Sequence, residues 1–188
     1  MNLLALDSRW RRLHDPAWIS PKSGRSFGGL IDIGYDHPDP WPHGDLAECG
    51  QDVLEVGADK LSADLCRCDG MRFVRAMLAL PIKGSDEAVQ FAIWAHVDDA
   101  DFYRYLEDAT GETPGFAGCA AWLMNDIPGF ESDTPFEGQL IPGDADERPT
   151  FEANDGPLKQ AQAEGISFEA LLDLYAATGN DIRADLTG

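Results

Sequence analysis

Two histidines and two aspartates lie close together in a proline-rich stretch, residues 35–43, and these side-chain types bind metals or transfer protons. His37, Asp39 and His43 are separated by two and four positions, and three prolines keep the backbone extended. An extended chain does not bring such groups together by itself. We therefore interpret the stretch as a structural loop with exposed histidines, and a metal or catalytic role stays open as the alternative.

A second candidate lies on a sheet face that carries Arg72 or Arg75 together with Trp94 and His96. Alternation in a strand points the two arginines to opposite faces. If Arg75 lies on the buried side it needs a partner, and the expected one is Asp64 or another carboxylate across the predicted hairpin. Such an ion pair fixes register without catalysing anything, and the alternative is an anion-binding groove with Trp94 as a stacking surface.

The four cysteines do not form a disulfide framework. Cys66 and Cys68 are one residue apart in a strand-like run, and we expect their side chains to point to opposite faces and not to pair easily. We interpret these thiols and Cys119 as buried and inert rather than nucleophilic. Phosphate-loop, nucleophile-elbow and zinc-protease motifs are missing from the sequence. We assign no catalytic residue, no metal ligand and no cofactor, and we predict ligand contacts at His37, Asp39, His43, Arg75, Trp94 and His96.

The charge balance narrows the possible partners. The chain has 34 acidic and 14 basic residues, which gives a net charge of −20. Phosphate backbones and anionic lipid surfaces are repelled by such a protein, so nucleic acid and membranes are disfavoured. A basic protein partner is compatible with this charge. The first 25 residues are different, with five basic and two acidic side chains, and could dock on the acidic body of the same chain or of a second copy in a homodimer.

The middle of the chain predicts an antiparallel meander over residues 62–97. Two β-like runs are separated by Asp69-Gly70, a pair typical of tight hairpin turns. In a third run, residues 88–97, apolar side chains alternate with polar ones. We predict an α+β fold with an antiparallel sheet of five or six strands built on this meander and helices packed to one side. Further strands are expected at residues 30–34, 116–124, 136–141 and 149–153, and helices at 7–14, 98–108, 157–164 and 167–178.

Several short motifs occur in a characteristic order, among them Tyr35-Asp-His-Pro-Asp-Pro-Trp41, Phe73-Val-Arg75, Pro128-Gly129 and Glu164-Gly-Ile-Ser167. In this order the chain resembles the bacterial family catalogued as domain of unknown function 2199. The resemblance implies a bacterial cytosolic protein and supplies no catalytic residues. We predict a single domain over residues 1–188, with a basic helical extension at 1–17, a family-like domain at 18–177 and a frayed tail at 180–188.

The amino-terminal segment departs from the pattern of that family. Many members resemble Cys-x-x-Cys-Gly-x-x-His-x-Gly here, a zinc-knuckle-like arrangement. The matching positions of this chain are Ser20, Ser23 and Phe27. A serine hydroxyl is a poor zinc ligand at neutral pH, so we predict that the chain folds without that metal and that the basic helix braces the segment.

We predict a cytoplasmic, non-enzymatic module that binds a basic protein, in the manner of an inhibitor or immunity protein. The prediction follows from the acidic surface and from the missing catalytic motifs. The alternative is a small metal-dependent or hydrolase-like enzyme that uses the loop with His37 and His43. A structural homodimer is the third possibility.

Overall fold

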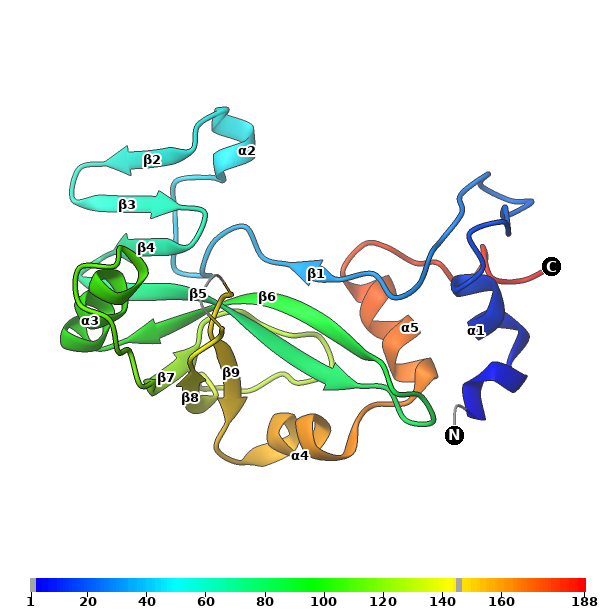
Figure 1. Ribbon diagram of the computed structural model, residues 1–188. Coiled ribbons are helices and arrows are strands. Elements are labelled where there is room, and N and C mark those ends of the chain that lie inside the picture. The colour runs from blue at the N-terminus through cyan, green and yellow to red at the C-terminus, as the bar shows by residue number, and fades with distance from the viewer. Residues whose placement is uncertain (1–2, 145–146) are drawn as a thin grey trace. The chain divides into compact units, whose positions relative to one another are not determined.

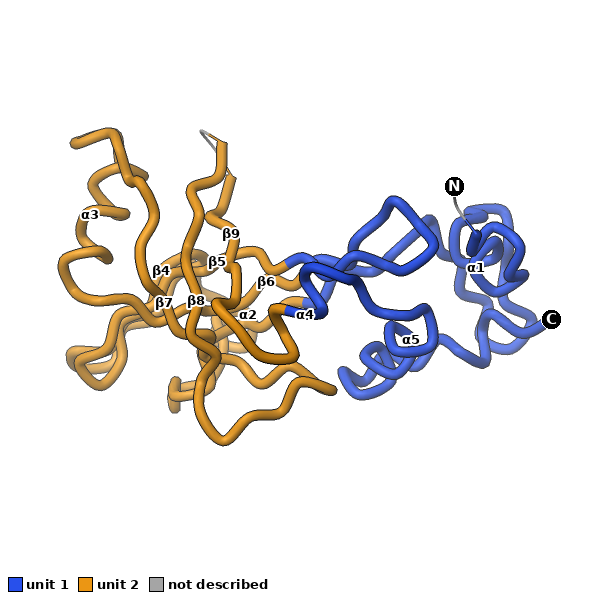
Figure 2. The backbone as a smooth tube through the Cα atoms, turned by 90° about the horizontal axis from the view of Figure 1, so that it is seen from below, with its two compact units in different colours: residues 1–33, 79–90, 160–188 blue, residues 34–78, 91–159 orange. Residues whose placement is uncertain are grey.

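The computed structural model describes residues 3–144 and 147–188, and the chain forms two compact units. Unit 1 comprises residues 1–33, 79–90 and 160–188, and unit 2 comprises residues 34–78 and 91–159 (Figure 2). The prediction of a single domain stays a prediction. No helix in the described part of the chain is both long and apolar enough to cross a membrane.

Five strands close into a mixed barrel (Figure 1). They are β5 (Met71–Pro81), β6 (Ala88–Val97), β7 (Cys119–Leu123), β8 (Glu137–Ile141) and β9 (Thr150–Ala153). Strands β6 to β9 pair in sequence with antiparallel neighbours, whereas β9 pairs with β5 in parallel through Thr150 and Met77. Because β5 also pairs with β6, the ring is closed.

Alternating side chains explain which face of each strand lies inside the barrel. The inward residues of β6 are almost completely buried, namely Val89, Phe91, Ile93, Ala95 and Val97. In β8 and β9, Leu140 and Phe151 are buried while Glu137 and Glu152 are exposed. Gly138 allows a close approach of these two strands, since a Cβ atom there would collide with the carbonyl oxygen of Glu152.

The hairpin and the strands of the predicted meander are confirmed. Asp69 and Gly70 have φ angles of 48° and 77°, as a tight hairpin turn with two left-handed residues requires. These two residues join β4 (Leu65–Cys68) to β5. Strand β6 comes next in the chain and pairs with β5. The mixed α and β class is confirmed as well.

The predicted antiparallel sheet of five or six strands is wrong. Within the described residues the sheet has nine strands, and its central part is the closed mixed barrel. Strand β5 has eleven residues and β4 only four, so β5 has free edge beyond β4, and this edge pairs with β9. Local periodicity shows which side chains share a face, but it does not show which distant strand occupies an edge. That the helices pack to one side stays a prediction.

Additional strands extend the sheet in unit 2. After β4 come β3 (Asp59–Ser62) and the edge strand β2 (Val53–Val56), which follows the short helix α2 (Leu46–Cys49). At the other end, β1 (Ile33–Gly34) pairs with β6. Strand β2 lacks an alternating apolar signal, because three of its four residues are exposed and only Leu54 is partly buried.

Helix α3 (Asp99–Ala109) also belongs to unit 2, and Asp98 precedes it as the N-cap residue. Phe102 is its buried residue. Helix α4 (Gly156–Glu164) begins in unit 2 and ends in unit 1.

Unit 1 is built from short helices and from the end of the chain. It contains the 3-10 helix η1 (Leu3–Leu6), α1 (Ser8–Leu13) and α5 (Phe168–Ala177). Arg9 of α1 pairs with Glu169 of α5 at 2.5 Å. The tail expected to be frayed is packed instead, since Ile182 and Leu186 are fully buried. These two apolar residues are four positions apart, a helical spacing that lets both face inward.

Candidate functional site

Asp39 is held by a hydrogen-bond network that joins the proline-rich loop to the segment after β7. One carboxylate oxygen accepts a bond from the side-chain amide of Asn125 at 3.0 Å, and the other accepts the backbone amide of Asp126 at 2.9 Å. Asn125 also donates to the carbonyl of His37 at 3.0 Å and accepts the backbone amide of Trp94 at 2.7 Å. Asn125 is only 5% exposed, so this network fixes the position of Asp39.

A hollow of about 270 Å³ opens beside this network. Its lining includes the carboxylates of Asp39, Asp126 and Asp133 and the aromatic rings of Phe130 and Phe136. Among the described residues, neither lysine nor arginine contributes to the lining. The hollow therefore combines negative charge with an apolar wall.

The environment of Tyr35 shows the same negative potential. Burial raises the pKa of Tyr35 to about 12, and the carboxylates of Asp39 and Asp126 act in the same direction. The Tyr35 hydroxyl donates to the carbonyl of Asp126 at 2.9 Å, and its own carbonyl accepts the indole N–H of Trp94 at 3.0 Å. The phenol therefore stays protonated and acts as a structural donor.

The two histidines of the loop have different partners. His43 Nε2 lies 2.8 Å from a carboxylate oxygen of Asp59, and this bond is the main reason that the pKa of Asp59 is lowered. The imidazole of His43 packs edge-on against Trp41 at 4.9 Å between ring centroids. His37 Nδ1 instead lies 3.0 Å from the carbonyl of Pro38. Within residues 3–144 and 147–188, no three His, Cys, Asp or Glu side chains are grouped so that they could hold a metal ion.

Arg75 and Trp94 do lie together. The guanidinium carbon is 5.6 Å from the centroid of the fully buried Trp94 ring, and Nη1 donates to the carbonyl of Ala63 at 3.2 Å. Burial is the main cause that lowers the pKa of Arg75. The expected pair with Asp64 is wrong, because the carboxylate of Asp64 binds Arg148 at 2.6 Å.

His96 lies between two aromatic rings, with centroid distances of 5.7 Å to Phe73 and 5.6 Å to Trp122. Its Nδ1 is 2.9 Å from the carbonyl of Arg72, so it connects β6 to β5. The structure thus brings Asp39, the backbone of His37 and Trp94 into one network, with Arg75 stacked on Trp94. It gives His43 and His96 separate surroundings, and of the six predicted residues only Asp39 lines the hollow.

Cys66, Cys68 and Cys119 have little thiolate character. Burial raises the pKa of Cys66 to about 12 and that of Cys119 to about 11, and it also raises the pKa of Cys68. Cys49 is exposed, and all four thiols are free. Because the thiolate is the nucleophilic form, the three shifted cysteines are poor nucleophiles.

Sequence reasoning missed a second hollow, of about 260 Å³, between β3, β4 and α3. Lys60, Arg67 and Leu65 line it from the sheet, and Phe102 and Tyr103 line it from the helix. Cys66 and Cys68 are both buried, so the expectation that they point to opposite faces is wrong, because residues two positions apart in a strand share a face. The available signal for the hollow was Arg67, which lies between these two cysteines and therefore points to the opposite face.

In unit 1, the segment at Ser20 is held by the end of the chain. The hydroxyl of the buried Ser20 donates to a carboxylate oxygen of Asp185 at 2.8 Å, and Arg25 lies 3.6 Å from the other oxygen. Arg12 donates to the carbonyl of Leu186 at 2.7 Å. The basic head of the chain thus has partners inside its own unit.

A protein family described as "Uncharacterized protein conserved in bacteria (DUF2199)" matches residues 21–166. The chain belongs to this family. The DUF2199 match includes the hollow at Asp39 and the hollow at Arg67, and it begins just after Ser20. Neither a curated protein nor a solved structure matches the chain. Membership of the DUF2199 family therefore assigns no activity to the site, and its function is argued from its chemistry.

Proposed function

We propose that this DUF2199 protein is a non-enzymatic binding module that engages a basic protein through the hollow at Asp39, Asp126 and Asp133. The lining of that hollow carries the proposal, because it combines three carboxylates with the rings of Phe130 and Phe136. Arginine and lysine have an apolar stem and a charged head, so one such side chain would use both parts of the lining. Cations also interact favourably with aromatic faces.

The charge of unit 2 supports the same proposal. This unit has 24 acidic and 7 basic residues, a net charge of −17, whereas unit 1 has 10 acidic and 7 basic residues. A field of this sign accelerates the encounter with a basic protein and slows the approach of an acidic one. Binding driven in this way weakens as salt concentration rises.

The bonding of the reactive groups favours binding over catalysis. Asp39 is fixed by neutral amide donors, and the ring nitrogens of His37 and His43 bind two different groups. The enzymatic alternative that uses His37 and His43 has less support for this reason. A homodimer formed through the basic head also has less support, because Arg12 and Arg25 bind the tail of their own chain.

The test compares two double variants of the full-length protein. Asp126→Asn/Asp133→Asn removes two charges from the hollow, and Asp52→Asn/Glu112→Gln removes two exposed charges of unit 2 elsewhere. A partner captured at physiological salt is purified, and its affinity is measured by titration calorimetry. We expect the hollow variant to bind at least about tenfold more weakly and the control variant to stay within about twofold of wild type.

Two results would contradict the proposal. An equal loss of affinity in both double variants would show that only the overall charge matters. Capture that disappears at moderate salt for every basic protein tested would show that the hollow has no specific partner.

A further inference from the structure

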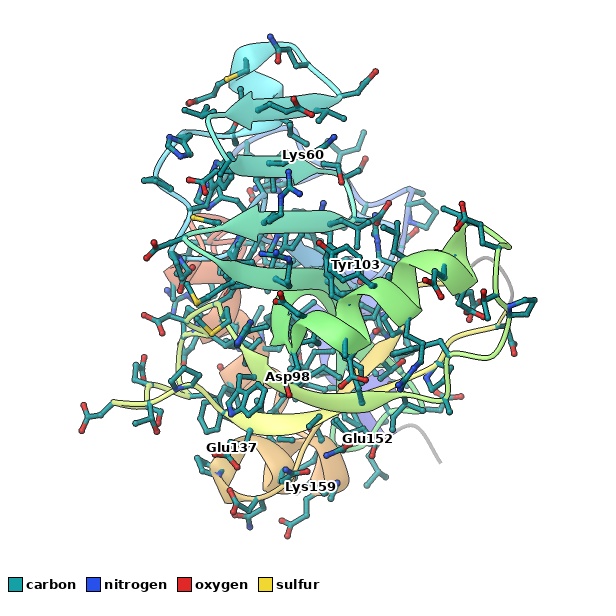
Figure 3. All side chains as sticks on the ribbon, turned by 90° about the vertical axis from the view of Figure 1, so that its left-hand side faces the viewer. Lys60, Asp98, Tyr103, Glu137, Glu152 and Lys159 are labelled. Atoms are coloured by element: carbon teal, nitrogen blue, oxygen red, sulfur yellow. The ribbon has the colours of Figure 1, made fainter. Side chains whose placement is uncertain are left out.

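The hollow between β3, β4 and α3 has the opposite charge from the rest of unit 2. Lys60 and Arg67 line it, and among the described residues no carboxylate does. Figure 3 shows α3 in front of the sheet, with Tyr103 on the helix and Lys60 on β3. Unit 2 has more than three acidic residues for each basic one, so a cationic lining is unexpected there. Such a lining indicates that the hollow binds an anion.

Strand register aligns three cations across this face. Lys60 lies opposite Arg67, and Arg67 lies opposite Arg72. Like charges directly opposite one another destabilise a sheet, so the alignment carries an energetic cost. Glu55 pairs with Lys60 at 2.7 Å and Asp99 lies 3.6 Å from Arg72, whereas Arg67 forms no ion pair with any described residue. The five side chains leave one unbalanced positive charge, at Arg67.

An apolar surface lies next to these cations. Leu65 comes from the sheet, and Phe102, Tyr103 and Leu106 come from α3. Tyr103 is 44% exposed, and the guanidinium of Arg72 is 6.0 Å from its ring centroid. A ligand placed here would therefore cover apolar surface that now faces water.

We propose that this groove binds a small molecule that carries one carboxylate on an apolar chain or ring. A single negative charge matches the one unbalanced cation, and the guanidinium of Arg67 offers the two parallel donors that a carboxylate accepts. A volume of about 260 Å³ is close to the lower end of the range for small-molecule sites. The site is separate from the acidic hollow, whose carboxylates would repel such a ligand.

The first test uses four probes with the full-length wild-type protein. Octanoate has both features, octanol lacks the charge, acetate lacks the chain, and inorganic phosphate has only a charged group. We expect octanoate to bind with one-to-one stoichiometry in titration calorimetry and to shift the amide NMR signals of residues 65–67 and 102–106. The other three probes should bind at least about tenfold more weakly, since each loses the ionic or the apolar contribution.

The second test removes the unbalanced cation. Arg67→Gln should weaken octanoate binding about tenfold or more, and Lys60→Gln should weaken it by a smaller factor. The matched control is Arg104→Gln, which removes the same charge from an exposed arginine of α3 outside the lining and should leave the affinity unchanged. Circular dichroism checks that each variant is folded, and the probe series stands even if one variant is not.

Several results would overturn the proposal. Octanol binding as tightly as octanoate would show an apolar patch without anion recognition, and tighter binding of phosphate would show a simple anion site. An equal loss in Arg67→Gln and Arg104→Gln would reduce the effect to general electrostatics. NMR shifts confined to other segments would place the ligand elsewhere.

Discussion

The side chain of Asn125 is the group whose removal tests the loop network most directly. In Asn125→Ala the backbone N–H of the fully buried Trp94 loses its acceptor. The carbonyl of His37 and the carboxylate of Asp39 lose a donor at the same time. The variant thus removes these three bonds between the proline-rich loop, Trp94 and the segment after β7 without changing any charge, and it leaves the bond from the Asp126 amide to Asp39 in place.

The expected loss follows from these three bonds. A buried donor left without an acceptor costs about 1–3 kcal/mol. The two donated bonds contribute about 1 kcal/mol more, because His37 and Asp39 lie near the surface and can bind water instead. The free energy of unfolding should fall by about 2–4 kcal/mol in total. For a chain of this length, the melting temperature should then fall by roughly 5–15 °C.

Asn125→Asp adds a test in which pH is the variable. The introduced carboxylate faces the His37 carbonyl and Asp39, both of which repel it, so the folded state raises its pKa above about 4. The folded variant then binds more protons than the unfolded chain, and its free energy of unfolding falls as pH rises above that value. At pH 7.5 we expect Asn125→Asp to be less stable than Asn125→Ala, with the difference disappearing towards pH 4.

Urea unfolding followed by tryptophan fluorescence measures both effects, and Asn154→Ala is the control because Asn154 is exposed. The reasoning is refuted if Asn125→Ala lies within about 0.5 kcal/mol of wild type, the usual range for a surface substitution. It is also refuted if the deficit of Asn125→Asp relative to Asn125→Ala does not change with pH.

Four further variants or reactions test other parts of the molecule. Asp185→Ala should lower the free energy of unfolding by about 1–3 kcal/mol in a urea titration, since it leaves a buried hydroxyl without its acceptor. Gly138→Ala should cost about 1–3 kcal/mol in the same assay, because the added methyl group collides with the neighbouring strand. In the folded protein a thiol reagent should modify Cys49 first, and Cys66 should react only after unfolding. Wild type should be more stable than Asp59→Asn at neutral pH and lose that advantage as pH falls below about 4, because the pKa of Asp59 is lowered in the folded state.

Much of the local structure could be predicted from the sequence, because its causes are local. Asp69-Gly70 supports two successive residues with positive φ, and this fixes the hairpin between β4 and β5. Ser167 caps α5 by accepting the amide of Ala170, as its position before an apolar run indicates. The barrel could not be predicted in this way, because its closure depends on a single parallel contact between Met77 and Thr150.

In the candidate site, too, single residues could be predicted from the sequence but their partners could not. The sequence indicates that Asp39 belongs to an unusual loop, but its partner Asn125 is 86 positions away and belongs to no motif. The cations of the groove are aligned only when β3, β4 and β5 have paired in their register. A prediction from spacing alone therefore finds single residues and misses the groups that pairing assembles.

The net charge of −20 disfavours nucleic acid and anionic membranes as partners, whereas the groove at Arg67 has a cationic lining. At physiological ionic strength charges are screened over about 8 Å, so the total charge governs the approach of a partner more than its final contacts. Inside a hollow, the few side chains of the lining decide which ion is stable. Long-range repulsion of anions by unit 2, the proposed binding of a basic protein at Asp126 and the proposed binding of a carboxylate beside Arg67 are therefore compatible, because they act over different distances.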